Sequence, residues 1–190
     1  MLMRMLPDFR IGLLNGWLPL VLYFIGLLLA VVSFSGQARA RLFEDPKLRM
    51  PAGVRVVRFL GQVAMLAYIG MMVFTPLTPG ALVFTVGALV YAAGYGSVMI
   101  ALRTFRQTPA NQVVVGGPYR FSRNPQWVGL ALVLAGAAIM SGVWLYLGFI
   151  LAVAIIYHVQ ILAEEKACLE QYGDRYRAYM AKVPHYFWLL

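Results

Sequence analysis

Long apolar stretches constrain this chain more than any other feature of its sequence. Four stretches reach or exceed the roughly 20 residues that a helix needs to cross the hydrocarbon core of a bilayer. They cover about residues 11–34, 56–75, 81–102 and 127–162. Backbone that faces lipid must satisfy its hydrogen bonds within its own segment, as a helix does. The sequence therefore predicts an all-α, polytopic membrane helical bundle.

The last apolar stretch is too long for a single crossing. It is interrupted at Ser141-Gly142, which predicts two helices, about 127–140 and 143–162, joined in a tight hairpin. Residues 75–80, between the second and third spans, contain two prolines and no charge, as expected of a connection. The count is then about five transmembrane helices, and four with a re-entrant segment is the alternative.

The composition excludes an ordinary soluble domain. Hydrophobic residues make up 62% of the 190 residues and charged residues 12%, whereas soluble domains average about 45–50% and 25%. The length suits one integral membrane domain over residues 1–190. The single cysteine, Cys168, excludes an internal disulfide framework and a cysteine-based metal cluster. We expect no metal site.

Basic residues predict the orientation of the bundle, because lysine and arginine concentrate in the cytoplasmic segments of membrane proteins. The net charge is +9, and anionic lipid headgroups explain it better than nucleic acid does. We expect the basic loops and the C-terminus in the cytoplasm and the N-terminus outside. With five spans, fourteen of the 16 basic residues share one side: Arg39, Arg41, Lys47, Arg49, Arg55, Arg58, Arg103, Arg106, Arg120, Arg123, Lys166, Arg175, Arg177 and Lys182.

The first apolar stretch is interpreted as a retained anchor helix. Arg4 and Arg10 precede residues 11–34, as basic residues precede the core of a signal peptide. The run is too long for such a core and lacks a small-residue cleavage site.

The C-terminal tail changes character after the fifth span. Glu164, Glu165 and Glu170 predict a polar continuation of the helix that ends near Gly173. Tyrosines then recur at a spacing of three to four residues, which predicts a second, amphipathic helix at the membrane interface. We interpret its tyrosines as interfacial anchors: Tyr172, Tyr176 and Tyr179.

Polar residues gather at two places that an antiparallel hairpin brings together. One is the connection over residues 111–127, where Asn124 is a good N-cap for a helix that begins at Pro125. The other is Glu164-Glu165, a turn beyond His158. Alone, these features indicate only a capped helix and a solvated helix end. The hairpin returns to the same membrane face, so we expect Arg123-Asn124 and Glu164-Glu165 to meet there. Adjacent helical residues point about 100° apart, so one of the two carboxylates would face a shared pocket.

These motifs resemble a superfamily of small membrane enzymes, the isoprenylcysteine carboxyl methyltransferases and phospholipid methyltransferases. The similarity covers about residues 111–184 and rests on Gly117-Pro118-Tyr119, Arg123-Asn124-Pro125-Gln126-Trp127, Glu164-Glu165 and Tyr172-Gly173. The carboxyl methyltransferases have histidine where this chain has Asn111 and Asn124, and tyrosine at Trp127. The Asn-Pro corner is more similar to phosphatidylethanolamine N-methyltransferases. These departures leave the acceptor open. The resemblance implies S-adenosylmethionine as the cofactor, bound by about residues 103–190.

The resemblance also implies roles for individual residues. Glu164 or Glu165 would bind the ribose hydroxyls or the amino group of the cofactor, and Arg123 its carboxylate or a lipid phosphate. Tyr119 and Trp127 would line the adenine or face the sulfonium. The implied cofactor-binding residues are Asn111, Gln112, Val113, Val114, Gly117, Tyr119, Arg123, Trp127, Glu164, Glu165, Gly94 and Gly96. The implied catalytic residues are Arg123, Asn124 and His158, with His158 as the base for an amine acceptor.

Two other functions compete with the leading hypothesis, a membrane methyltransferase acting on a lipid or lipophilic amine, carboxylate or thiol. A sterol-reductase-like enzyme would use a nicotinamide cofactor at a similar Arg-Asn-Pro corner, but such proteins are usually longer. A transporter or scaffold is the alternative without catalysis. Transporters show internal repeats and intramembrane charges, whereas the first four spans contain no charge except Arg58 near one end.

Overall fold

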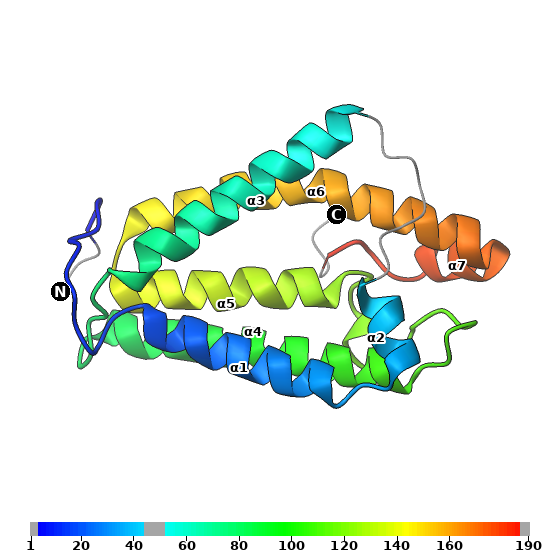
Figure 1. Cartoon of the computed structure of the whole chain (residues 1–190), viewed down its shortest axis with the longest axis horizontal. Helices are drawn as coiled ribbons and strands as arrows, with labels where there is room; N and C mark the ends of the chain where they lie inside the picture. The colour runs from blue at the N-terminus through cyan, green and yellow to red at the C-terminus, as the bar shows by residue number, and fades with distance from the viewer. Residues whose placement is uncertain (1–3, 44–51, 187–190) are drawn as a thin grey trace.

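Seven α-helices and one 3₁₀ turn make up the part of the chain that the structure describes. The structure is a computed structural model that describes residues 4–43 and 52–186. Figure 1 shows the longer helices running along the length of the molecule and the short α2 and α7 at the end opposite the N-terminus. In chain order the elements are α1 (Trp17–Val32), α2 (Gly36–Phe43), α3 (Ala52–Val73), α4 (Leu82–Gln107), the 3₁₀ turn η1 (Gly117–Arg120), α5 (Pro125–Ser141), α6 (Trp144–Tyr172) and α7 (Asp174–Met180).

The predicted membrane bundle of five apolar helices is confirmed, with unequal lengths. By length and composition, α3, α4 and α6 are able to cross a membrane. The helices α1 and α5 are apolar but have 16 and 17 residues. At 1.5 Å per residue they extend only about 25 Å, slightly less than the hydrocarbon thickness.

The first helix begins later than the predicted Ile11, because the preceding chain pairs with two turns of the bundle. Gly16 N–H donates to Thr75 O at 2.9 Å, and Leu77 N–H donates to Leu14 O at 2.9 Å. A Cβ on Gly16 would lie 2.4 Å from the backbone oxygen of Met72. The Gly16 N–H and the Leu14 carbonyl are therefore bound to the turn after α3 and are not free for the hydrogen bonds of a longer α1.

The predicted hairpin is confirmed. Helix α5 ends at Ser141, and α6 begins after a turn in which Gly142 has φ +69°. This left-handed conformation suits glycine because a side chain would crowd the backbone there. The start of α5 and the end of α6 therefore lie toward the same end of the molecule, the one that carries α2 and α7 (Figure 1).

Small residues hold α4 and α5 in close contact. A Cβ on Gly94 would lie 2.7 Å from Gly129 O, and one on Gly136 would lie 2.4 Å from Tyr91 N. Two glycines on each helix, seven residues apart, thus let the backbones touch. This contact fixes the start of α5 against the middle of α4.

Alanine at Gly94 is expected to destabilise the bundle by about 1–3 kcal/mol, because the added methyl group overlaps backbone atoms of α5. Alanine at Gly96, where a Cβ meets nothing within 4 Å, is the matched control and is expected to be neutral. Thermal unfolding in detergent micelles measures both effects. Equal destabilisation by the two variants would contradict this packing role. Weaker cofactor binding by the Gly96 variant would instead support the cofactor role implied for Gly94-x-Gly96.

Candidate functional site

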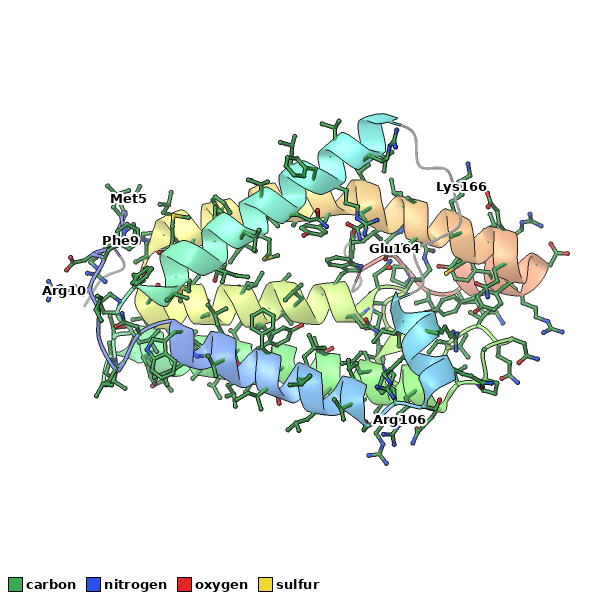
Figure 2. All side chains as sticks on the ribbon, in the orientation of Figure 1. Met5, Phe9, Arg10, Arg106, Glu164 and Lys166 are labelled. Carbon is green, nitrogen blue, oxygen red and sulfur yellow. The ribbon has the colours of Figure 1, made fainter. Side chains whose placement is uncertain are left out.

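A large cavity lies where the hairpin meets the connection between α4 and α5. Its volume is about 890 Å³, within the range of small-molecule sites. Glu164, which lies on α6, lines this cavity. Figure 2 shows that Met5 and Phe9 lie far from it, at the other end of the molecule. The lining residues come from six helices, α2 to α7, and from the connection between α4 and α5: Arg41, Leu42, Arg58, Phe105, Val113, Val114, Tyr119, Arg123, Asn124, Pro125, Gln126, Trp127, Gln160, Glu164, Glu165, Ala167, Cys168, Glu170, Gln171, Tyr172, Tyr176 and Tyr179.

A buried ion pair joins the start of α5 to α6. Arg123 Nε and Nη2 donate to Glu165 Oε1 and Oε2, each at 3.0 Å, and the two side chains are 6% and 5% exposed. Asn124 Nδ2 adds a bond to Glu165 Oε1 at 2.7 Å. Although Asn124 occupies the predicted N-cap position, its side chain makes no capping bond. The prediction that the Arg123-Asn124 corner meets the acidic pair is confirmed.

The same corner fastens the chain that follows α7, residues 181–186, which we call the C-terminal strap. This segment turns back from α7 toward α5 (Figure 1). Arg123 Nη1 donates to Val183 O at 3.0 Å and to Met180 O at 3.1 Å. His185 Nδ1 lies 2.9 Å from Glu165 Oε1. Through these contacts, Arg123 and Glu165 hold the strap and the hairpin together.

Among the residues that the structure describes, two donors bind Glu164 at the cavity, and both are neutral. Trp127 Nε1 donates to its Oε2 at 3.1 Å, and Gln160 Nε2 donates to its Oε1 at 2.9 Å. The Trp127 ring packs on Tyr157 with centroids 4.8 Å apart. A carboxylate accepts about four hydrogen bonds, so Glu164 keeps acceptor capacity for a ligand. Only one of the two adjacent carboxylates was expected to face a shared pocket, but both line this cavity. They differ in their partners, and Glu164 is the one with acceptor capacity to spare.

The opposite wall is formed by the connection and by buried tyrosines. Val113 and Val114 line the cavity. Tyr179 Oη donates to Tyr119 O at 2.6 Å, and Gln126 Nε2 donates to Tyr119 Oη at 2.9 Å. Burial raises the pKa of Tyr119 to about 12, although the bond from Gln126 opposes the rise. Tyr119 is therefore a neutral wall residue at physiological pH.

The structure places the predicted site residues in two groups. At the cavity it brings together Val113, Val114, Tyr119, Arg123, Asn124, Trp127, Glu164 and Glu165. The remaining predicted residues are not among the lining residues. Asn111, Gln112 and Gly117 are exposed in the connection, and Gly94 faces α5. His158, the predicted base, has its Nδ1 2.7 Å from Tyr186 Oη.

One interpretation of the tail is corrected. Tyr176 and Tyr179 were expected to anchor an interfacial helix, but they are 5% and 8% exposed and pack with Val183 against Val113 and Leu169. The spacing of three to four residues is equally typical of an inward face. Burial also raises the pKa of both tyrosines. Tyr172 belongs to the end of α6 and not to the following helix.

Arg41, Gln160 and His185 have roles at the site that the sequence did not reveal. Arg41 binds the backbone of the connection, Gln160 binds Glu164, and His185 contacts Glu165. Gln160 lies one helical turn before Glu164, a spacing that could have revealed it. Arg41 and His185 are far in sequence from their partners and leave no local pattern.

The comparison with protein families shows the family of this chain. The model of the phospholipid methyltransferase family matches residues 77–175, which is more than half of the chain and includes α4, the connection, α5 and α6. This chain belongs to the phospholipid methyltransferase family. The search of curated proteins found no match. In this family member the cavity is completed by segments on both sides of the matched region, since Arg41 precedes it and Tyr176 and Tyr179 follow it.

Proposed function

We propose that this protein transfers a methyl group from S-adenosylmethionine to a lipid or lipophilic acceptor in the cavity at the mouth of the α5–α6 hairpin. The observation that carries the proposal is the pocket-facing Glu164, oriented by Trp127 and Gln160 beside aromatic and apolar walls. Membership of a membrane methyltransferase family supports it. The nicotinamide-dependent and transport alternatives have no comparable support.

The residues of the cavity fit such a cofactor. Glu164 has the acceptor capacity to bind ribose hydroxyls or an ammonium group. Val113 and Val114 offer backbone groups and an apolar surface to the adenine, and Trp127 offers a ring face to a cation. The volume of about 890 Å³ leaves space for part of an acceptor as well.

The protein contributes placement and charge to the reaction. Bound S-adenosylmethionine would supply an electrophilic methyl group, and in-line displacement depends mainly on proximity and alignment. Glu164 and Trp127 provide a carboxylate and an aromatic face that favour positive charge. The guanidinium of Arg123 is bound to Glu165 and to Val183 of the strap, so we assign Arg123 and Asn124 to positioning and not to the cofactor carboxylate.

Proton removal depends on the acceptor. A carboxylate or thiolate acceptor has no proton to lose, whereas an amine acceptor needs a base. His158 contacts Tyr186 and does not line the cavity. Glu170 is an exposed carboxylate among the lining residues. We therefore propose Glu170 as the base that accepts the proton of an amine acceptor.

The cavity is proposed to open at the cytoplasmic face. Arg106 and Lys166 lie toward the end of the molecule that carries α2 and α7, and Arg10 lies at the opposite end (Figure 2). Concentrated basic residues favour the cytoplasmic side. Of the residues that support this orientation, Lys47 and Arg49 lie outside the described part of the chain.

The proposed activity is tested by incubating the purified protein with S-adenosylmethionine carrying a labelled methyl group and a total lipid extract. We expect label in a lipid fraction, and less of it when S-adenosylhomocysteine is added. Mild alkali separates the acceptor classes, because it releases the label of a methyl ester as methanol and leaves N-methyl and S-methyl groups intact. Absence of transfer, together with absence of cofactor binding by calorimetry, would contradict the proposal.

A further inference from the structure

An arginine that precedes the family-matched region, Arg41, donates hydrogen bonds to several backbone carbonyl groups at the end of α4 and in the connection that follows it. Arg41, on α2, donates through Nη1 to Thr108 O at 3.0 Å and to Pro109 O at 3.3 Å. Its Nη2 donates to Gln112 O at 3.2 Å. Three carbonyl groups of one irregular segment thus converge on one guanidinium.

Two side chains complete this arrangement. Arg41 Nη2 also donates to Tyr172 Oη at 3.2 Å, and Tyr172 donates in turn to Ala110 O at 3.2 Å. The Arg41 guanidinium carbon lies 4.5 Å from the centre of the Phe105 ring, a cation–π contact. Arg41 therefore links α2, the end of α4, the connection and the end of α6.

The connection needs such support because it has no regular structure of its own. Residues 109–116 form no helix or strand, and yet Val113 and Val114 line the cavity. Thr108 is the C-cap of α4, where carbonyl groups lack helical partners and a positive charge is favourable. A planar guanidinium with five N–H donors is suited to several carbonyl groups at once.

We propose that Arg41 is a positioning residue of the cofactor site, which holds the connection in its binding conformation before the cofactor arrives. This inference rests on the proposed function, since it assigns the cavity to S-adenosylmethionine. Without Arg41 the connection samples more conformations, and cofactor binding must order it again. Preorganisation of this kind acts on affinity for the ligand that touches the ordered segment. It does not act on the transfer step itself.

The test compares the wild type with Arg41→Gln, Arg41→Lys and Arg39→Gln in the full chain. Arg39 lies on the same helix and is exposed, so its variant controls for lost charge. For Arg41→Gln we expect the Kd and KM for S-adenosylmethionine to rise about tenfold, with kcat and the KM for the acceptor changed less than about twofold. Arg41→Lys should be intermediate because an ammonium lacks the planar fork. Arg39→Gln should match the wild type.

Hydrogen exchange of the peptide over residues 108–116, without cofactor, gives a second readout. We expect faster exchange in Arg41→Gln and protection that returns when the cofactor is saturating. If Arg41→Gln does not fold, the same measurements on Arg41→Lys decide. Unchanged cofactor affinity in a folded Arg41 variant would overturn this inference, and so would an equal change in kcat and both KM values. If the wild type itself binds no cofactor, the proposed function fails instead.

Discussion

Replacing Glu164 with glutamine is expected to lower kcat/KM for S-adenosylmethionine by about a hundredfold, because hydrogen bonds to a charged group contribute roughly 1.5–3 kcal/mol each. The substitution keeps the shape of the side chain but removes its charge and one acceptor. Trp127 and Gln160 currently orient both oxygens, and an amide has one oxygen to share between them. Steady-state kinetics and calorimetry measure the effect.

Asp174→Asn is the matched control for Glu164→Gln. Asp174 begins α7, its side chain is 93% exposed and its partner is Arg177. The substitution removes one negative charge from the same end of the molecule without touching the cavity, and we expect unchanged kinetics. If Glu164→Gln behaves like this control, the assignment of Glu164 to the cofactor is wrong.

Replacing Arg123 with methionine is expected to lower the free energy of unfolding by about 3 kcal/mol, because it leaves the buried Glu165 carboxylate without its main counter-charge. The carbonyl groups of Met180 and Val183 lose their donor as well. Thermal and denaturant unfolding in detergent micelles measure the loss. A matched control is Arg120→Met, since Arg120 is exposed on the preceding 3₁₀ turn.

The double variant Arg123→Met with Glu165→Met separates stability from positioning. Apolar residues that replace both partners of a buried ion pair often restore stability, so we expect most of the loss to be recovered. Cofactor affinity should be weaker than in the wild type, because the strap and the turn of α6 that carries Glu164 are no longer joined by the Arg123–Glu165 pair. A double variant that regains both stability and full affinity would contradict a positioning role for the pair.

The meeting of the Arg123-Asn124 corner with the acidic pair could be predicted because it depends on helix lengths and one turn. Ser141-Gly142 marks the hairpin, and the two apolar runs on either side have enough residues to return to one face. Helix–helix packing was also predictable from Gly94 and its neighbours, since small residues on apolar helices permit close approach. These features are local or periodic in the sequence.

The remaining parts of the site depend on long-range contacts to backbone atoms. The strap is held through the carbonyl groups of Val183 and His185, and every residue type has a carbonyl group, so no sequence pattern reveals such contacts. Arg41 is likewise bound to the carbonyl groups of a segment far along the chain. Helix α2 is only 8 residues long and polar on average, below the length at which periodicity is informative.

The most direct test of the proposed cofactor site is a structure of the protein with S-adenosylhomocysteine bound. We expect the ligand inside the cavity, with Glu164 within hydrogen-bond distance of its ribose or amino group and with the Arg123–Glu165 pair intact. A ligand beside Gly96, or one whose carboxylate displaces Glu165 from Arg123, would contradict the assignment of Glu164 to binding and of Arg123 to positioning.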